Sequence, residues 1–104
     1  MRICRVVGTV VGLRSADRIP GPTYLLVAPA TTDGAARGLP IVAVDAVQAG
    51  EGDLVLLSQG SSCRQVREPE GLNTIDTAID ALVIGVVDLI DEAGKVTYRS
   101  GSAK

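Results

Sequence analysis

The chain has 104 residues, which is enough for one domain with its own core and leaves no room for a second. It contains no histidine, so the Ser-His-Asp and Cys-His arrangements of nucleophilic catalysis are excluded. Ten basic against twelve acidic side chains give a formal net charge of -2, which provides no net attraction to nucleic acid or to an anionic membrane.

Four short β-strands separated by turn signals are predicted in the first part of the chain. Their ranges are 2–13, 24–29, 41–44 and 53–58. The first is β-branched and long for a strand, with Gly8 and Gly12 as the expected places for a bend or bulge. Polar residues 31–38 are expected to form an exposed loop. This rhythm of short strands and turns is typical of a small barrel or sandwich.

The stretch LLSQGSSCRQV places two serines and a cysteine at the end of the fourth strand. Ser61, Ser62 or Cys63 would need a base to act as a nucleophile, and the chain has no histidine to provide one. The S-x-x-Q spacing of Ser62 and Gln65 instead fits a capping box, so we predict that these two residues cap a short helix. A phosphate cradle at Gly60 is the weaker alternative, because no Walker lysine follows it.

A second short helix is predicted after Asn73 or Thr74, with an apolar face that runs through Leu82. Asp76 and Asp80 lie on its polar face, where nothing would raise a carboxyl pKa. A solvated face is therefore favoured over a general acid/base pair.

The run LVIGVVDLI, residues 82–90, is predicted as the fifth strand. It is nearly all apolar, so we expect it to be covered on both sides. After it the sequence predicts a glycine turn, a short sixth strand around residues 96–98 and a flexible tail.

The two cysteines, Cys4 and Cys63, lie far apart without a C-x-x-C spacing and could offer a metal only two sulfur ligands per chain. We expect reduced, packed thiols, with no metal and no cofactor.

No apolar run reaches the length of a membrane span, and Met1 is followed at once by a strand pattern. We therefore expect no membrane partner, no signal peptide and a cytoplasmic location.

Hydrophobic residues make up 46% of the chain and are almost all Val, Leu, Ile and Ala, because Phe and Trp are absent. The core must therefore be aliphatic. So much aliphatic material is hard to bury within one small globule, so we expect part of it to face another subunit of an oligomer.

Four stretches of the chain resemble the EutN/CcmL family of bacterial microcompartment vertex proteins. They are RVVGTVV, LLVAPA, VAVDAVQAGEGDLVLLSQGSSCR and AIDALVIGVVD. The third is the most specific, and the resemblance covers residues 1–91, which we take as a single domain followed by the turn, short strand and tail of residues 92–104. Cys63 stands where the familiar pattern often has alanine, which changes packing only.

The resemblance implies a mainly β fold: a five-stranded barrel related to the OB-fold, with one or two short helices, assembled as a cyclic homopentamer. It also implies a structural role without catalysis, in which the pentamer closes the fivefold vertices of a polyhedral shell beside hexameric and pseudohexameric shell proteins. The expected location is then the shell of a microcompartment in the cytoplasm. Gly60, Ser61 and Ser62 are the candidate residues for lining a pore on the fivefold axis.

An OB-fold nucleic-acid-binding protein is the alternative from another class, because the barrel is shared. Such proteins stack bases on aromatic side chains along a positively charged groove. This chain has two tyrosines and a net negative charge, so we expect no nucleic-acid partner.

Overall fold

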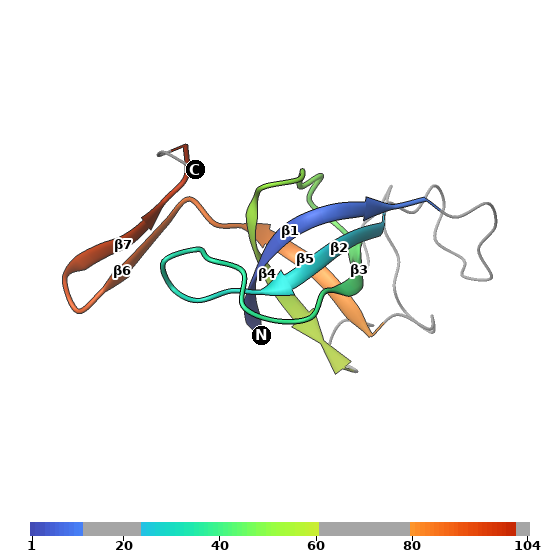
Figure 1. Ribbon diagram of the computed structural model, residues 1–104, viewed down its shortest axis with the longest axis horizontal. Coiled ribbons are helices and arrows are strands. Elements are labelled where there is room, and N and C mark those ends of the chain that lie inside the picture. The colour runs from blue at the N-terminus through green and yellow to red at the C-terminus, as the bar shows by residue number, and fades with distance from the viewer. Residues whose placement is uncertain (12–23, 61–79, 102–104) are drawn as a thin grey trace, which may run out of the picture.

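The structure, a computed structural model, describes residues 1–11, 24–60 and 80–101. Most of these residues lie in β-strands. Five of the strands make a barrel, and the last two form a hairpin beside it (Figure 1). The strands are β1 (Arg2–Val10), β2 (Tyr24–Pro29), β3 (Ile41–Asp45), β4 (Leu54–Gln59), β5 (Ala81–Val86), β6 (Leu89–Glu92) and β7 (Lys95–Arg99).

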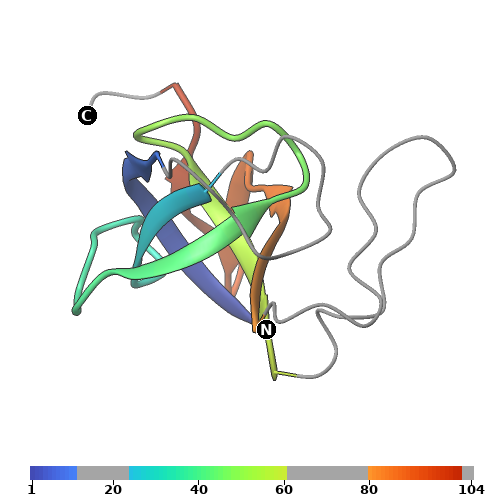
Figure 2. The same ribbon diagram turned by 90° about the vertical axis from the view of Figure 1, so that its right-hand side faces the viewer.

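The barrel is closed, with the spatial order β1-β2-β3-β5-β4. Its neighbouring strands pair antiparallel, except that β3 and β5 run parallel and share two residue pairs. Figure 2 shows the strands wrapped around a common interior. Because a closed barrel has no free edge, its strands leave few backbone groups for another chain to pair with. The predicted five-stranded barrel is confirmed.

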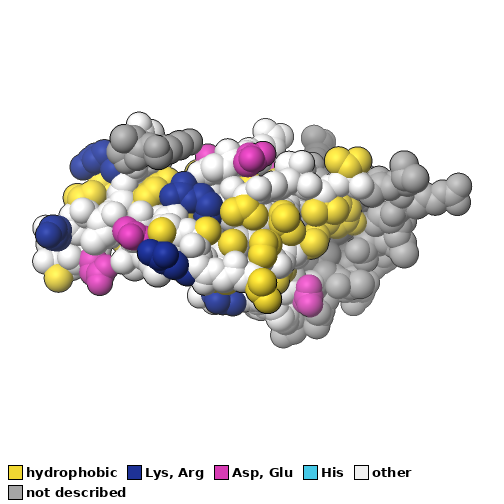
Figure 3. Space-filling model, in the orientation of Figure 1, with side chains coloured by type: hydrophobic (Ala, Val, Ile, Leu, Met, Phe, Trp, Pro, Cys, Tyr) yellow, Lys and Arg dark blue, Asp and Glu magenta, His cyan; other side chains and the backbone are white. Residues whose placement is uncertain are grey.

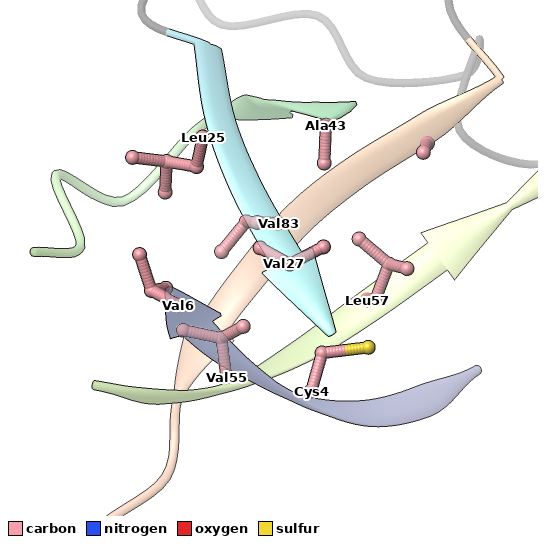
Figure 4. Close-up of a cluster of buried hydrophobic side chains, with 9 residues drawn as sticks. Cys4, Val6, Leu25, Val27, Ala43, Val55, Leu57 and Val83 are labelled. Carbon is pink, nitrogen blue, oxygen red and sulfur yellow. The ribbon is translucent and has the colours of Figure 1, made fainter. Parts of the chain in front are cut away.

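The interior of the barrel is aliphatic, as the composition requires. In β1, Cys4 and Val6 point inward and Arg5 between them points outward, which is the alternation of a strand with one buried face. Each barrel strand contributes to the central cluster (Figure 4). Its members are Cys4, Val6, Leu25, Val27, Ala43, Val55, Leu57, Ala81 and Val83.

The first strand bends where the sequence predicts. Its register with β2 shifts between Val6 and Gly8, which is the expected irregularity at that glycine. The predicted length is wrong, because β1 ends at Val10 and Val11 is 90% exposed. Gly12, the other expected bend, lies outside the described residues.

The predicted fifth strand is wrong in its second half. β5 ends at Val86, and a new strand begins at Leu89. The Val87 N–H still donates to the Leu54 carbonyl of β4 at 2.8 Å, so the chain leaves the barrel between residues 87 and 89. Val86 is 50% exposed, so the subunit itself does not provide the expected cover on both faces.

The C-terminal hairpin, β6 with β7, is a separate two-stranded antiparallel sheet. Its turn contains Ala93 and Gly94, which have φ values of 55° and 82°. The Ser100 N–H donates to the Asp88 carbonyl at 2.8 Å and closes its base. β7 includes the short strand expected at residues 96–98.

Both predicted helices fall on residues 61–79, outside the described part of the chain, and stay predictions up to residue 79. The expected continuation of the second helix through Leu82 is wrong. Leu82 is fully buried in β5, where it pairs with Val44 of β3. Its apolar neighbours fit a buried strand as well as a helix face, and the periodicity of a short run does not distinguish them.

Candidate functional site

The hairpin projects from one end of the barrel and gives the described molecule its elongated shape, with extents of 42 × 25 × 22 Å (Figure 1). A two-stranded hairpin alone is at best marginally stable in water, so its position depends on contacts outside its own ladder. Figure 3 shows hydrophobic side chains gathered over the barrel on this face and most visible basic side chains toward the hairpin. The contacts between barrel and hairpin are therefore the first candidates for a functional role.

Arg5 lies at the centre of these contacts. Its Nε donates to the Gly34 carbonyl at 2.8 Å and its Nη1 to the Gly52 carbonyl at 2.6 Å, while its Nη2 also donates to Gly34. The guanidinium carbon lies 5.5 Å from the centre of the Tyr98 ring, within range of a cation–π interaction. One side chain of β1 thus joins the loop of residues 31–36, the turn before β4 and strand β7. We call Arg5, Gly34, Gly52 and Tyr98 the joint.

Gly34 is required at its place in the joint. Its φ is +88°, in the left-handed region that favours glycine. A Cβ there would lie 2.6 Å from both the Arg5 Nη2 and the Tyr98 Cδ1 atoms. The absence of a side chain therefore lets the loop, the guanidinium and the ring approach each other.

The loop around Gly34 is held by its own polar groups. Asp33 Oδ1 accepts hydrogen bonds from the Thr31 hydroxyl and from the Ala35 N–H, the latter at 3.0 Å. The Thr31 hydrogen bond first, and then the Ala35 amide, lower the pKa of Asp33 below its ordinary value. Hydrogen bonds within the loop thus hold its shape, in addition to its contacts with the hairpin.

A second contact joins the loop to the hairpin. The Thr32 hydroxyl donates to Glu92 Oε1 at 2.7 Å. Between loop and hairpin lies an open cavity of about 580 Å³, lined mainly by the loop and β7, with Arg5 and Tyr98 on its wall. Thr97 Oγ1 is buried beside it and has no hydrogen-bond partner among the described residues. The hairpin therefore rests on the barrel through a few discrete contacts.

An apolar groove lies where the hairpin leaves the barrel. Its volume is about 590 Å³, and it is wide open to solvent. The lining residues are Ile3, Leu56, Val86, Val87, Asp88, Leu89, Ile90 and Asp91. Val86 and Leu89 are 50% and 42% exposed, so the subunit alone leaves this aliphatic surface in water.

Of the residues predicted as a pore lining and a helix cap, the structure describes only Gly60, which directly follows the end of β4. Gly60 is exposed, has a φ of +75°, and its N–H donates to the Asp80 carbonyl at 2.9 Å. Ser61, Ser62 and Gln65 lie outside the described residues. Both the pore and the helix cap therefore stay predictions.

Cys4 is a free thiol inside the barrel. Burial raises its pKa, and the charge of nearby Arg2 lowers it by a smaller amount. A protonated thiol among aliphatic side chains is a packing group, as expected from the sequence.

Among the described residues, no helix is long and apolar enough to cross a membrane.

The joint was not predicted as a site from the sequence. In the sequence, Arg5 lies within the first predicted strand and Tyr98 within the short sixth strand, and neither residue is marked by a motif. A usable signal existed: a charged residue flanked by inward-facing apolar residues in a strand must point out of the barrel. The sequence does not show which carbonyls and which ring meet it there.

A small closed barrel with a projecting hairpin and an uncovered aliphatic groove is the architecture of a subunit made for assembly. The sequence matches the family described as "Ethanolamine utilisation protein EutN/carboxysome" over residues 1–88, and the chain belongs to this family. It is 40% identical to the bacterial microcompartment shell vertex protein PduN of Salmonella typhimurium, in a match that covers 86% of this chain and 98% of PduN.

Solved structures agree with the sequence match. CcmL of Gloeobacter violaceus superposes with a TM-score of 0.84 at 33% identity, over 96% of this chain and 98% of that one. GrpN of Rhodospirillum rubrum, described as a pentameric microcompartment shell protein, superposes with a TM-score of 0.74 at 36% identity, over 88% and 99%. The chain is thus a structural shell vertex protein and not an enzyme, and these relatives give no support to a nucleic-acid-binding role.

Proposed function

We propose that five copies of this chain form a ring that occupies the fivefold vertices of a bacterial microcompartment and closes its polyhedral shell. The observation that carries the proposal is the family match over residues 1–88, together with the likeness to a pentameric shell protein. A flat sheet of hexagonal units closes into a polyhedron only when pentagonal units are inserted. The role therefore depends on the shape of the ring and does not require a chemical reaction.

The described surface supports a ring of identical subunits. The apolar groove and the hairpin lie side by side, and both carry half-exposed aliphatic side chains such as Val86, Leu89 and Val96. A contact between two different patches of the same chain repeats by rotation, and it closes into a ring when the successive rotations complete a full turn. We assign the groove to contact with the next copy of this chain, because burial of aliphatic area drives stable association.

The hexameric and pseudohexameric shell proteins are the proposed partners outside the ring. The loop of residues 31–38 offers them a polar surface, with Asp33 and Arg37 exposed at its tip and end. Such an edge provides modest contacts that gain strength when five equal copies engage together. Gly60, Ser61 and Ser62 remain our candidates for the pore lining.

Native mass spectrometry at low micromolar concentration tests the ring, with a pentamer as the expected mass. A monomer or a dimer under these conditions would contradict the proposal.

Shell closure is tested by co-expression with hexameric microcompartment shell proteins. Electron microscopy should show closed polyhedra with the chain and open or leaky shells without it. Arg37→Glu should reduce closure while the ring persists, whereas Glu51→Lys, an equal charge reversal on another exposed turn, should leave closure unchanged. Shells that close equally well without the chain, and without another vertex protein, would exclude the role.

A further inference from the structure

The angle between hairpin and barrel is not fixed by backbone pairing. The Val87 N–H bonds to Leu54 of β4, and β6 begins at Leu89, so Asp88 alone connects the barrel ladder to the hairpin. β6 and β7 pair only with each other among the described strands. Rotation about one residue would swing the whole hairpin, so side-chain contacts must set its direction.

We propose that Arg5 is a positioning residue for assembly: it fixes the hairpin against the barrel at the angle at which one subunit can meet the next. This inference rests on the proposed homopentamer. A ring of five closes only if each subunit presents its two contact patches at a fixed relative rotation. The hairpin adjoins the groove that we assign to the neighbouring copy, so its direction is part of that geometry.

The geometry of the joint requires arginine. Three N–H groups of Arg5 reach two carbonyls on separate turns, while the guanidinium carbon lies over the Tyr98 ring. Lysine carries the same charge on a single nitrogen, which cannot span two carbonyls and stack on a ring at the same time. Arg5 is also anchored at its base, because its backbone pairs with β2 and β4 on either side.

The loop gives the joint a rigid second wall. The Ala30 N–H donates to the Ile3 carbonyl at 3.0 Å, and Ala30 also forms a bridge with Ala36, so the loop is tied to the barrel at its start. The Thr32–Glu92 hydrogen bond, by contrast, is exposed to solvent and starts from the loop rather than from a barrel strand. Arg5 therefore joins the hairpin directly to a barrel strand.

The test compares Arg5→Lys with Arg2→Lys, the same substitution at an exposed position of the same strand. Hydrogen exchange should show hairpin amides of Arg5→Lys opening about tenfold faster, with the barrel amides unchanged, as expected for loss of charge-assisted hydrogen bonds. Native mass spectrometry across a dilution series should show its pentamer dissociating at about tenfold higher protein concentration. Arg2→Lys should match the parent in both measurements.

Tyr98→Leu and Tyr98→Phe test the same contact from the hairpin, and they decide the question if Arg5→Lys does not fold. The leucine variant loses the cation–π contact and should loosen the hairpin and weaken the ring, whereas the phenylalanine variant keeps the ring face and should behave as the parent. Pentamers of Arg5→Lys and Tyr98→Leu with parental stability and hairpin protection would overturn the inference and leave the proposed function intact. A parent that forms no pentamer would instead contradict the proposed function.

Discussion

The barrel and the hairpin are both built from β-strands that pair mainly antiparallel, but they are held in place by different forces. The barrel closes on itself around a cluster in which Val27, Val55 and Leu57 have no exposed surface. The hairpin has no interior, and its Leu89 and Val96 are more than two-fifths exposed. Its attachment relies on a guanidinium, a ring and a few polar groups. The barrel therefore stabilises the subunit, whereas the hairpin depends on directional contacts and on a neighbour.

This difference separates two kinds of mutation. A change inside the barrel should lower the free energy of unfolding of the whole domain, because all five barrel strands contribute to the central cluster. A change at the joint should alter the direction of the hairpin and the strength of the ring while the barrel stays folded. The following predictions test that separation.

The largest effect is expected for Leu57→Ala. Leu57 is fully buried in the central cluster, and removal of its side chain should lower the free energy of unfolding by about 2–5 kcal/mol. Urea unfolding followed by circular dichroism measures the loss. Val96→Ala on the half-exposed hairpin is the matched comparison and should cost less than about 1 kcal/mol. Equal losses for the two variants would show that barrel and hairpin share one core.

Gly34→Ala should have the next largest effect. The new Cβ would need a left-handed backbone and the space held by Arg5 and Tyr98, so we expect a cost of about 1–3 kcal/mol and a displaced hairpin. Gly50→Ala is the control, because a Cβ there would meet only Asp53 at 3.9 Å. Thermal unfolding with hydrogen exchange separates the two. Unchanged hairpin protection in Gly34→Ala would contradict the close packing of the joint.

The dry interior of the barrel can be tested through the Cys4 thiol. Burial raises its pKa, so the neutral form is favoured in the folded state and stability is fully present below the unfolded pKa of about 8.5. Stability should fall as the pH rises above that value, by up to about 1.4 kcal/mol per pH unit until the folded pKa is reached. Urea unfolding in a Cys63→Ser background measures this fall in the free energy of unfolding, and Cys4→Ala should abolish it.

The smallest effect is expected on the loop side of the joint. The Thr31 hydroxyl is the main cause of the lowered pKa of Asp33, so Thr31→Val should raise that pKa toward its ordinary value. The contribution of Asp33 to stability is present above the ordinary carboxyl pKa and is lost as the pH falls through the lowered one. An NMR titration of the Asp33 carboxyl follows the change. Thr32→Val, which removes only the contact to Glu92, should leave the pKa of Asp33 unchanged.

Much of the barrel could be predicted from local sequence, because strands with one buried face alternate and turns carry glycine and polar residues. The irregularity at Gly8 and the aliphatic core follow from composition and pattern. The errors fall where one mostly apolar run passes from the barrel to the hairpin and its residue types do not mark the boundary. LVIGVVDLI contains barrel strand, connection and hairpin strand in nine residues, and only the Val87 bond to Leu54 shows where the barrel ends.

The joint shows the same division between local pattern and long-range contact. The sequence by itself determined that Gly34 lies in a loop and that the chain lacks the histidine of common catalytic groups, and the apolar residues on either side of Arg5 carry the signal for its outward direction. Only the tertiary structure decided that Arg5 meets carbonyls 29 and 47 residues away and the ring of Tyr98. The physical reason is that strand alternation and turn propensity act over a few residues, whereas a side chain's partners are set by how the closed barrel brings distant turns together.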